Sequence, residues 1–145
     1  MSLDANKQLI RRVIHLFNAR DWEHFDAIYT PDCIVVDPGK PADMNAAQYV
    51  AQLCGAYDEA FPDLQYRLDD IIAEGDLVAT HWTATGTHTG RLEIGDITLF
   101  ATEKPFEVSA ISMDRIRDGR IVQTRQIVDF FGFFMQLDLI AFKQA

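Results

Sequence analysis

At 145 residues, with 48% hydrophobic and 24% charged side chains, the chain has the size and composition of one globular domain covering residues 1–145. Its net charge of −9 and its scattered Lys and Arg residues argue against binding to nucleic acid or to an anionic membrane, because both surfaces attract clustered positive charge. Cys33 and Cys54 form no Cys-x-x-Cys pair, and no apolar stretch resembles a signal peptide or a membrane span, so we expect two buried free thiols in a cytoplasmic protein.

Helical patterns dominate the chain before Pro62. Residues 4–19 repeat apolar side chains at helical spacing, which predicts an amphipathic helix. Asp21 is a suitable cap for a second, shorter helix, which would bury Trp22, Phe25, Ile28 and Tyr29. After a short β run at residues 33–36 and a loop with Pro and Gly, Asn45 is expected to cap a third helix.

Long antiparallel strands follow, and they are expected at residues 64–73, 77–87, 106–117 and 120–128. Residues 90–104 form a variable connection with room for a short strand, and residues 131–142 predict a closing helix. Helices followed by hairpin-connected strands indicate an α+β fold. We expect a curved, mostly antiparallel sheet wrapped over three N-terminal helices, with a cone-shaped space between the two layers.

Asp129 is the most informative residue of the pattern, because it ends the last strand and precedes four phenylalanines, Phe130, Phe131, Phe133 and Phe134. Desolvation by such neighbours favours the neutral acid, and a carboxyl group tuned in this way can exchange protons near neutral pH. The alternative is that Asp129 caps the C-terminal helix by accepting backbone N–H bonds. The local sequence leaves both interpretations open.

Arg125 complicates the first interpretation, because it lies two pleats before Asp129 on the same face of the strand. If both side chains point inward, the guanidinium lowers the pKa that the phenylalanines raise. If that face is the outer one, a bulge or the strand end has to turn Asp129 inward. The sequence does not decide between these arrangements.

The strand at residues 77–87 alternates, and its bulkier face carries Trp82 and, just past its end, His88. We expect this face to look toward the helices, whereas His81 would lie on the opposite face, at solvent or a subunit contact. His88 could then steer the proton of an interior carboxyl group. The alternative is a histidine at the loop edge that bonds a neighbouring strand.

Metal-ligand spacing is absent from the four histidines, and the sequence lacks a Gly-rich phosphate loop and a nucleophile elbow. By elimination, the expected chemistry is proton transfer with no metal and no cofactor.

Several segments resemble the SnoaL-like polyketide cyclase family: FPDL at residues 61–64, EGD at 74–76, WTATGTHTG at 82–90 and DGRIV at 118–122, followed by Asp129 and QL at 136–137. The resemblance implies the nuclear transport factor 2-like cone. It also implies that the aspartate after the last strand is the general acid/base of an intramolecular aldol condensation, without metal or cofactor. That position is Asp129 here, and the family's cavity histidine matches His88.

The chain departs from the family pattern at two places. Arg125 stands where relatives often have tryptophan, and the loop at residues 91–104 is apolar rather than rich in Gly and Pro. We therefore expect a remodelled cavity mouth, and the family's substrate is not transferred to this chain.

The leading hypothesis is a cofactor-independent enzyme in which Asp129 and His88 are catalytic and an apolar, oxygenated small molecule is the substrate. The residues expected to contact that substrate are Trp82, Phe17, Met113, Phe133 and Phe134. Isomerase-like (ketosteroid-isomerase type) or epoxide-hydrolase-like chemistry and a non-catalytic ligand-binding module are the alternatives. The outer face of an open curved sheet also predicts a homodimer.

Overall fold

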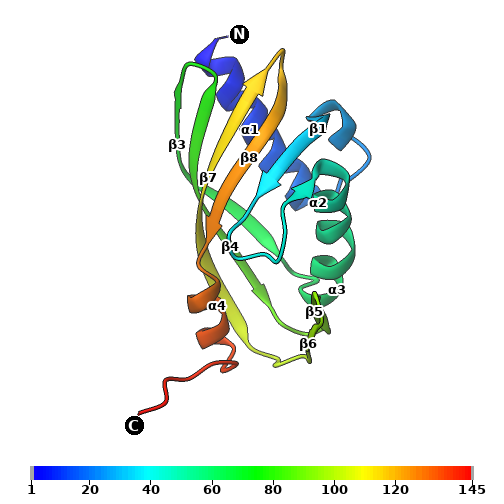
Figure 1. The fold of residues 1–145 in the computed structure, drawn as a ribbon, viewed down its shortest axis with the longest axis vertical. Helices are drawn as coiled ribbons and strands as arrows, with labels where there is room; N and C mark the ends of the chain where they lie inside the picture. The colour runs from blue at the N-terminus through cyan, green and yellow to red at the C-terminus, as the bar shows by residue number, and fades with distance from the viewer. Residues whose placement is uncertain (1, 145) are drawn as a thin grey trace.

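The computed structural model describes residues 2–144, in which a curved sheet wraps around helices packed on its inner face (Figure 1). The helical elements are α1 (Leu3–Ala19), the 3-10 turn η1 (Phe25–Ala27), α2 (Ala46–Gln52), the π-helical turn η2 (Leu53–Tyr57), α3 (Asp58–Ala60) and α4 (Phe130–Gln136). The strands are β1 (Tyr29–Val36), β2 (Met44–Asn45), β3 (Gln65–Glu74), β4 (Leu77–Thr87), β5 (Leu92–Ile94), β6 (Ile97–Leu99), β7 (Pro105–Arg117) and β8 (Arg120–Val128). The predicted α+β architecture is confirmed.

The large sheet has the strand order β2-β1-β8-β7-β4-β3, and only the pairing of β1 with β8 is parallel. The variable connection after β4 holds the small β5–β6 hairpin, which lies toward the same end of the fold as α4 (Figure 1). Strand β7 follows the alternation of its sequence, since every second residue from Phe106 to Ile116 is buried.

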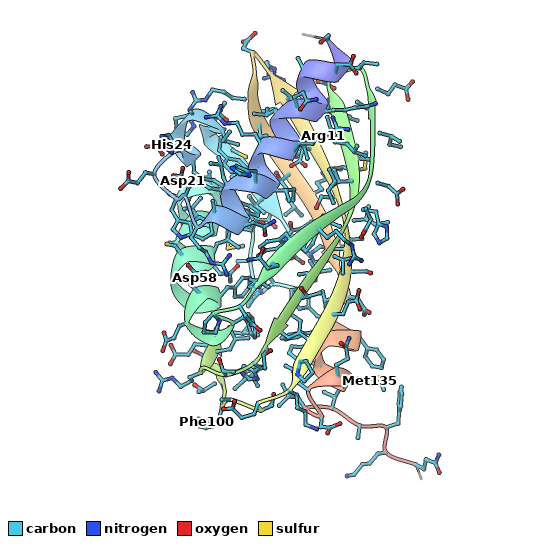
Figure 2. The ribbon with its side chains drawn as sticks, turned by 180° about the vertical axis from the view of Figure 1, so that it is seen from behind. Arg11, Asp21, His24, Asp58, Phe100 and Met135 are labelled. Carbon is cyan, nitrogen blue, oxygen red and sulfur yellow. The ribbon has the colours of Figure 1, made fainter. Side chains whose placement is uncertain are left out.

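The second predicted helix is wrong in extent, because only the 3-10 turn η1 forms and Tyr29 already belongs to β1. Asp21 does not act as the expected cap, since its carboxylate binds Nδ1 of His24 at 2.7 Å; Figure 2 labels both residues. The backbone of Ile28 accepts a hydrogen bond from Ile121 on β8, so sheet pairing overrides the local helical pattern.

The third predicted helix begins as expected, because Asn45 and Gln48 form a capping box at the start of α2. It continues through η2 and α3, and η2 is a π-helical turn, a local widening of the helix that often occurs at functional sites. Tyr57 lies at the end of this turn.

The closing helix is shorter than the predicted 131–142, since α4 ends at Gln136. Asp138 adopts a left-handed backbone conformation with φ 56°, and the amide of Leu139 bonds the carbonyl of Phe134. These contacts cap the last carbonyl groups and turn the chain away from the helix axis.

The two cysteine side chains differ in exposure. Cys33 is fully buried, but Cys54 is exposed, so the expectation of two buried thiols is wrong for Cys54, which lies on the solvent side of η2. Within residues 2–144, no helix is both long and apolar enough to cross a bilayer.

Candidate active site

A cavity of about 110 Å³ lies between the inner face of the sheet and the helices. Its wall is mainly aromatic and includes Phe17, Tyr49, Phe61, Tyr66, Trp82 and Phe133. Polar side chains from the sheet interrupt this wall, notably Asp37, Ser112, Asp114, Thr124 and Gln126. An apolar cavity with a few convergent polar groups is the usual form of a small-molecule site.

Three of the residues expected to contact a substrate lie on this wall, namely Phe17, Trp82 and Phe133. Trp82 is held in place because its indole N–H donates to Oγ of Ser112 at 2.8 Å. Phe133 packs edge-on against Phe61, with the two ring centroids 5.7 Å apart. These contacts give the wall a fixed shape.

Met113 and Phe134 do not line the cavity, so that part of the expectation is wrong. Met113 points to the outer face of the sheet and is 44% exposed, because its neighbours Ser112 and Asp114 take the inward positions of β7. Phe134 packs against the rings of Phe130 and Phe133, which line the cavity, but does not line it itself.

Asp129 also lies outside the cavity, and its expected place as an interior acid is wrong. Its side chain is exposed and caps α4, because Oδ1 accepts a hydrogen bond from the amide of Gly132 at 2.9 Å. A Cβ atom at residue 132 would collide with this carboxylate, which explains the glycine in the Phe-rich segment. The capping interpretation describes what Asp129 does in the structure.

A bulge in β8 causes this outward placement. The register with β7 shifts by one residue between the pairs Arg115–Gln123 and Ile116–Ile121. Ile121 points inward before the bulge, whereas Thr124 and Gln126 point inward after it. Arg125 therefore lies on the outer face with Asp129, and neither side chain reaches the cavity.

His88 is fully buried but does not line the cavity, so its expected position on the cavity wall is wrong. Its Nδ1 accepts from the amide of Thr102 at 3.3 Å, and its backbone bonds Glu103 and Lys104. Burial lowers the pKa of the imidazole below its usual range, and the carbonyl of Gly90 opposes this effect. His88 thus ties the end of β4 to the segment leading into β7, which is the loop-edge alternative.

Asp114 is the buried acid that the sequence interpretation missed. It projects from the inner face of β7 into the cavity and is only 7% exposed. Burial raises the pKa of its carboxyl group to about 6, and the hydrogen bond from Oγ1 of Thr124, at 2.5 Å, opposes that rise. The alternation along β7 was a usable signal, because it placed an acid on a face that is otherwise apolar or small.

Asp37 is a second missed acid, at the end of β1, and it is 3% exposed. Its Oδ1 accepts from the amide of Gly39 at 2.9 Å, and its Oδ2 accepts from Nε2 of Gln126 at 3.0 Å. Asp37 therefore fixes Gln126 and the loop after β1, and it is more fully hydrogen-bonded than Asp114. In the part of the chain that the structure describes, no cluster of three or more His, Cys, Asp or Glu side chains could hold a metal ion.

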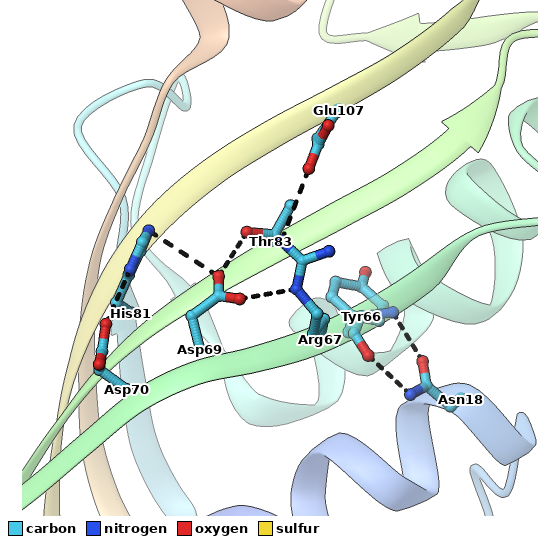
Figure 3. A network of polar contacts seen from close by, with 8 residues as sticks. All are labelled: Asn18, Tyr66, Arg67, Asp69, Asp70, His81, Thr83 and Glu107. Atoms are coloured by element: carbon cyan, nitrogen blue, oxygen red, sulfur yellow. Dashed lines mark hydrogen bonds and ion pairs between the residues drawn. The ribbon is translucent and has the colours of Figure 1, made fainter.

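The outer face of β3 and β4 carries a separate polar network (Figure 3). Asp69 accepts from Nε of Arg67 at 2.7 Å and from Oγ1 of Thr83 at 2.5 Å, and His81 binds Asp70 at 3.2 Å. The outward position of His81 agrees with the alternation of β4. This network lies on the face opposite the cavity and links the edge strand β3 to its neighbour β4.

A cone of this kind, with a curved sheet closing over helices and an aromatic cavity, defines the nuclear transport factor 2-like class of proteins. The family model for SnoaL-like polyketide cyclases matches residues 7–137, and the chain belongs to this family. No protein of curated function matches the sequence.

Solved structures agree with this assignment. The proposed polyketide cyclase IdmH of Streptomyces antibioticus is 30% identical, with 92% of this chain and 98% of that chain covered and a TM-score of 0.77. A proposed polyketide cyclase of Acidithiobacillus ferrooxidans is 25% identical, with coverage of 97% and 100% and a TM-score of 0.77. AclR of Streptomyces galilaeus, a proposed hydroxylase, is 24% identical and similar in fold, with a TM-score of 0.81 and coverage of 99% and 91%.

Proposed function

We propose that the protein is a polyketide-cyclase-type enzyme that uses Asp114 as a general acid/base on a small, apolar, oxygenated substrate in the cavity. The observation that carries this proposal is a buried carboxyl group that faces the cavity, where burial raises its pKa to about 6. A group with such a pKa is ionised at neutral pH and is still basic enough to accept a proton from carbon. Asp114 takes the role that the sequence pattern assigned to Asp129.

The proposed reaction is an aldol-type ring closure without a cofactor. Ionised Asp114 removes a proton from the carbon next to a carbonyl group, which leaves an enolate and a neutral carboxyl group. The enolate carbon then bonds to a second carbonyl carbon of the same molecule, and Asp114 returns the proton to the resulting alkoxide. Thr124 keeps the carboxyl group oriented through its hydrogen bond, and the aromatic wall excludes water.

The test is deuterium uptake from D₂O into β-tetralone, a bicyclic ketone, followed by NMR. Proton removal next to the carbonyl is the first step of the proposed reaction, so this probe needs no knowledge of the natural substrate. We expect Asp114→Asn to lower the enzymatic exchange rate about 100-fold or more, because general-base catalysis contributes roughly 10² to 10⁴. The wild-type rate should rise with pH through about 6, as Asp114 ionises.

Asp129→Asn is the matched control, since it makes the same change in a carboxyl group on the outer face. Its exchange rate should stay within about twofold of the wild-type rate, because a residue outside the cavity does not touch the ketone. Loss of exchange in Asp129→Asn with retention in Asp114→Asn would contradict the proposal. So would a wild-type rate equal to that of buffer although β-tetralone binds.

Epoxide hydrolysis is the second candidate, and the observation that favours it is the set of polar groups around Asp114. The Asp37–Gln126 pair and Thr124 could hold a water molecule against an epoxide carbon. Ketosteroid-isomerase-like proton transfer would use the same base as the ring closure but form no carbon–carbon bond. Product analysis with candidate ketones and epoxides separates the three reactions.

We also propose that the protein is a cytoplasmic homodimer formed through the outer face of the sheet. Ile111, Met113, Ile127 and Phe131 are between 44% and 70% exposed and line one shallow groove on that face. The same groove carries Arg125 and Asp129, so a second copy related by a two-fold axis offers opposite charges around an apolar centre.

Ile127→Lys should convert this dimer to a monomer, because two buried ammonium groups would meet across a two-fold interface. The matched control is Ile72→Lys on β3, since Ile72 is 69% exposed against 70% for Ile127 but lies outside the groove. Sedimentation at micromolar concentration should show a dimer for the wild type and for Ile72→Lys. A monomeric wild type would contradict the proposal.

A further inference from the structure

Lys40 lies beside the cavity on the loop between β1 and β2. The amide of Lys40 bonds the carbonyl of Asp37 at 2.9 Å, which makes a tight turn after β1. The turn is pressed against α4, because a Cβ atom at Gly39 would collide with the ring of Phe130. The backbone around Lys40 is therefore fixed relative to the cavity wall, which includes Asp37 and Phe130.

The amine of Lys40 lies against two aromatic rings, 4.7 Å from the centroid of Tyr57 and 5.0 Å from that of Phe130. Desolvation lowers the pKa of this amine to about 8, and the charge of Asp37 opposes the effect. At pH 7 the amine is still cationic, although it is half-buried. Attraction to the two ring faces offsets part of the cost of desolvation.

No carboxylate lies within ion-pair distance of Lys40 among residues 2–144. The charge of Asp37 acts on Lys40, but both oxygens of Asp37 already accept hydrogen bonds, from Gly39 and Gln126. A half-buried cation without a paired anion is costly unless a ligand supplies the negative charge. Lys40 is therefore a positive group without a directly paired carboxylate at the edge of an apolar cavity.

Tyr57 connects this charge to the cavity. The amine of Lys40 donates a hydrogen bond to the hydroxyl oxygen of Tyr57, and Tyr57 lines the cavity. Burial keeps the pKa of this phenol well above its ordinary value, so the hydroxyl group keeps its proton. Its O–H has no acceptor among the hydrogen bonds of the described residues, and the ammonium group behind it strengthens it as a donor.

A second polar atom in the cavity also lacks a partner. Oε1 of Gln52, on α2, lines the cavity and is buried without a hydrogen bond among residues 2–144. Oε1 of Gln52 is an acceptor, whereas the O–H of Tyr57 is a donor. A ligand that pairs with both therefore carries an anionic or carbonyl-type oxygen for Tyr57 and a hydroxyl group for Gln52. The remaining wall around Tyr57 is aromatic, with Phe61 and Phe130 as neighbours.

We propose that Tyr57 and Lys40 form an oxyanion-binding site for the ionised phenol or enol oxygen of an aromatic ligand. Tyr57 donates the hydrogen bond to that oxygen, and Lys40 supplies the positive charge behind it. The inference rests on the proposed function in placing the substrate in this cavity. It adds the substrate class, a hydroxylated aromatic or enolisable molecule, and a place for the negative charge that leaves Asp114 during proton removal.

The test is equilibrium binding of para-nitrophenol at pH 7, with nitrobenzene as the neutral ligand of similar shape. The phenolate form of para-nitrophenol has its own absorption band, so the bound ionisation state is read directly. We expect the wild type to bind the phenolate in preference to the phenol. Lys40→Met and Tyr57→Phe should each weaken phenolate binding about tenfold or more and leave nitrobenzene binding within about twofold, since each removes one polar group and keeps the apolar volume.

Lys104→Met is the matched control, because it removes the same charge from a surface lysine whose amine binds Asp138. Equal phenolate affinity in Lys40→Met, Tyr57→Phe and Lys104→Met would overturn the site. So would a wild type that binds nitrobenzene and the neutral phenol better than the phenolate. If ketone exchange does not depend on Asp114 while phenolate binding depends on Lys40, the acid/base assignment is wrong and the oxyanion site stands. If exchange depends on Asp114 but phenolate binding does not depend on Lys40, only the oxyanion site is overturned.

Discussion

Asp114→Asn is expected to stabilise the folded protein at pH 8 by about 3 kcal/mol while it removes the proposed acid/base activity. The pKa of Asp114 rises from its ordinary value of 3.8 to about 6 on folding. Each pKa unit of that rise corresponds to about 1.4 kcal/mol, so folding disfavours the ionised carboxyl group of Asp114 by about 3 kcal/mol. Asn has the same shape and keeps an acceptor for the hydroxyl group of Thr124.

The sign of the pH dependence follows from the raised pKa. Between pH 4 and 6 the folded protein binds the proton of Asp114 more tightly than the unfolded chain does, so this residue makes stability fall as the pH rises through about 6. Asp114→Asn lacks this contribution. The free-energy difference between variant and wild type should therefore be small near pH 4 and reach its full value above pH 7.

Urea unfolding at several pH values measures this difference, with an unchanged m-value as the sign that compactness is the same. Asp129→Asn is again the control, because Asn caps a helix about as well as Asp does, and its stability should stay near that of the wild type. Asp63 and Asp69 carry lowered pKa values and give the opposite slope, but they are common to all three proteins and cancel in the comparison. A stability difference that does not change with pH would contradict the assignment.

The fold followed from local signals because most of the strand residues alternate between apolar and polar and the turns carry Gly or Asp at the positions that need them. Gly75 and Gly119 have φ of 58° and 76°, and both were visible in the sequence as hairpin turns. The early end of α4 was not visible, since it depends on Asp138 adopting a left-handed conformation that few non-glycine residues take.

The site was harder to predict, because one bulge exchanges the inward and outward positions of all residues of β8 that follow it. The pattern of β8 put Arg125 and Asp129 on the same face as Ile121, which is buried. The shift after Ile121 moved both to the outside, and nothing in residues 121–123 announces it. β7 has no such shift before Arg115, so simple alternation places Asp114 correctly inside. An acid on an unbroken strand was the more secure candidate.

His88→Ala is expected to lower the free energy of unfolding by about 2–4 kcal/mol, a loss at the upper end for single substitutions. The change leaves an empty space beside Phe61, whose ring centroid lies 5.6 Å from the imidazole, and it removes the acceptor for the amide of Thr102. His81→Ala is the matched control on the outer face, where the side chain is 40% exposed, and should cost less than about 1 kcal/mol.

The pH dependence of this effect has the opposite sign to that of Asp114. The pKa of His88 is lowered in the folded state, so the unfolded chain binds its proton more tightly. His88 therefore makes the wild type lose stability as the pH falls below about 6.5, the ordinary value of histidine, and His88→Ala does not share that loss. In urea unfolding, the difference in the free energy of unfolding between the wild type and His88→Ala should be largest above pH 7 and decrease toward pH 5.

A gap that stays constant from pH 5 to 8 would mean that His88 is not buried in its neutral form. A loss as small as that of His81→Ala would mean that the contacts with Thr102 and Phe61 do not hold the β4 end. Neither result would bear on Asp114, because His88 does not line the cavity. The two residues separate the roles that the sequence pattern had joined: the imidazole of His88 holds the end of β4, and the carboxyl group of Asp114 in the cavity is the proposed acid/base.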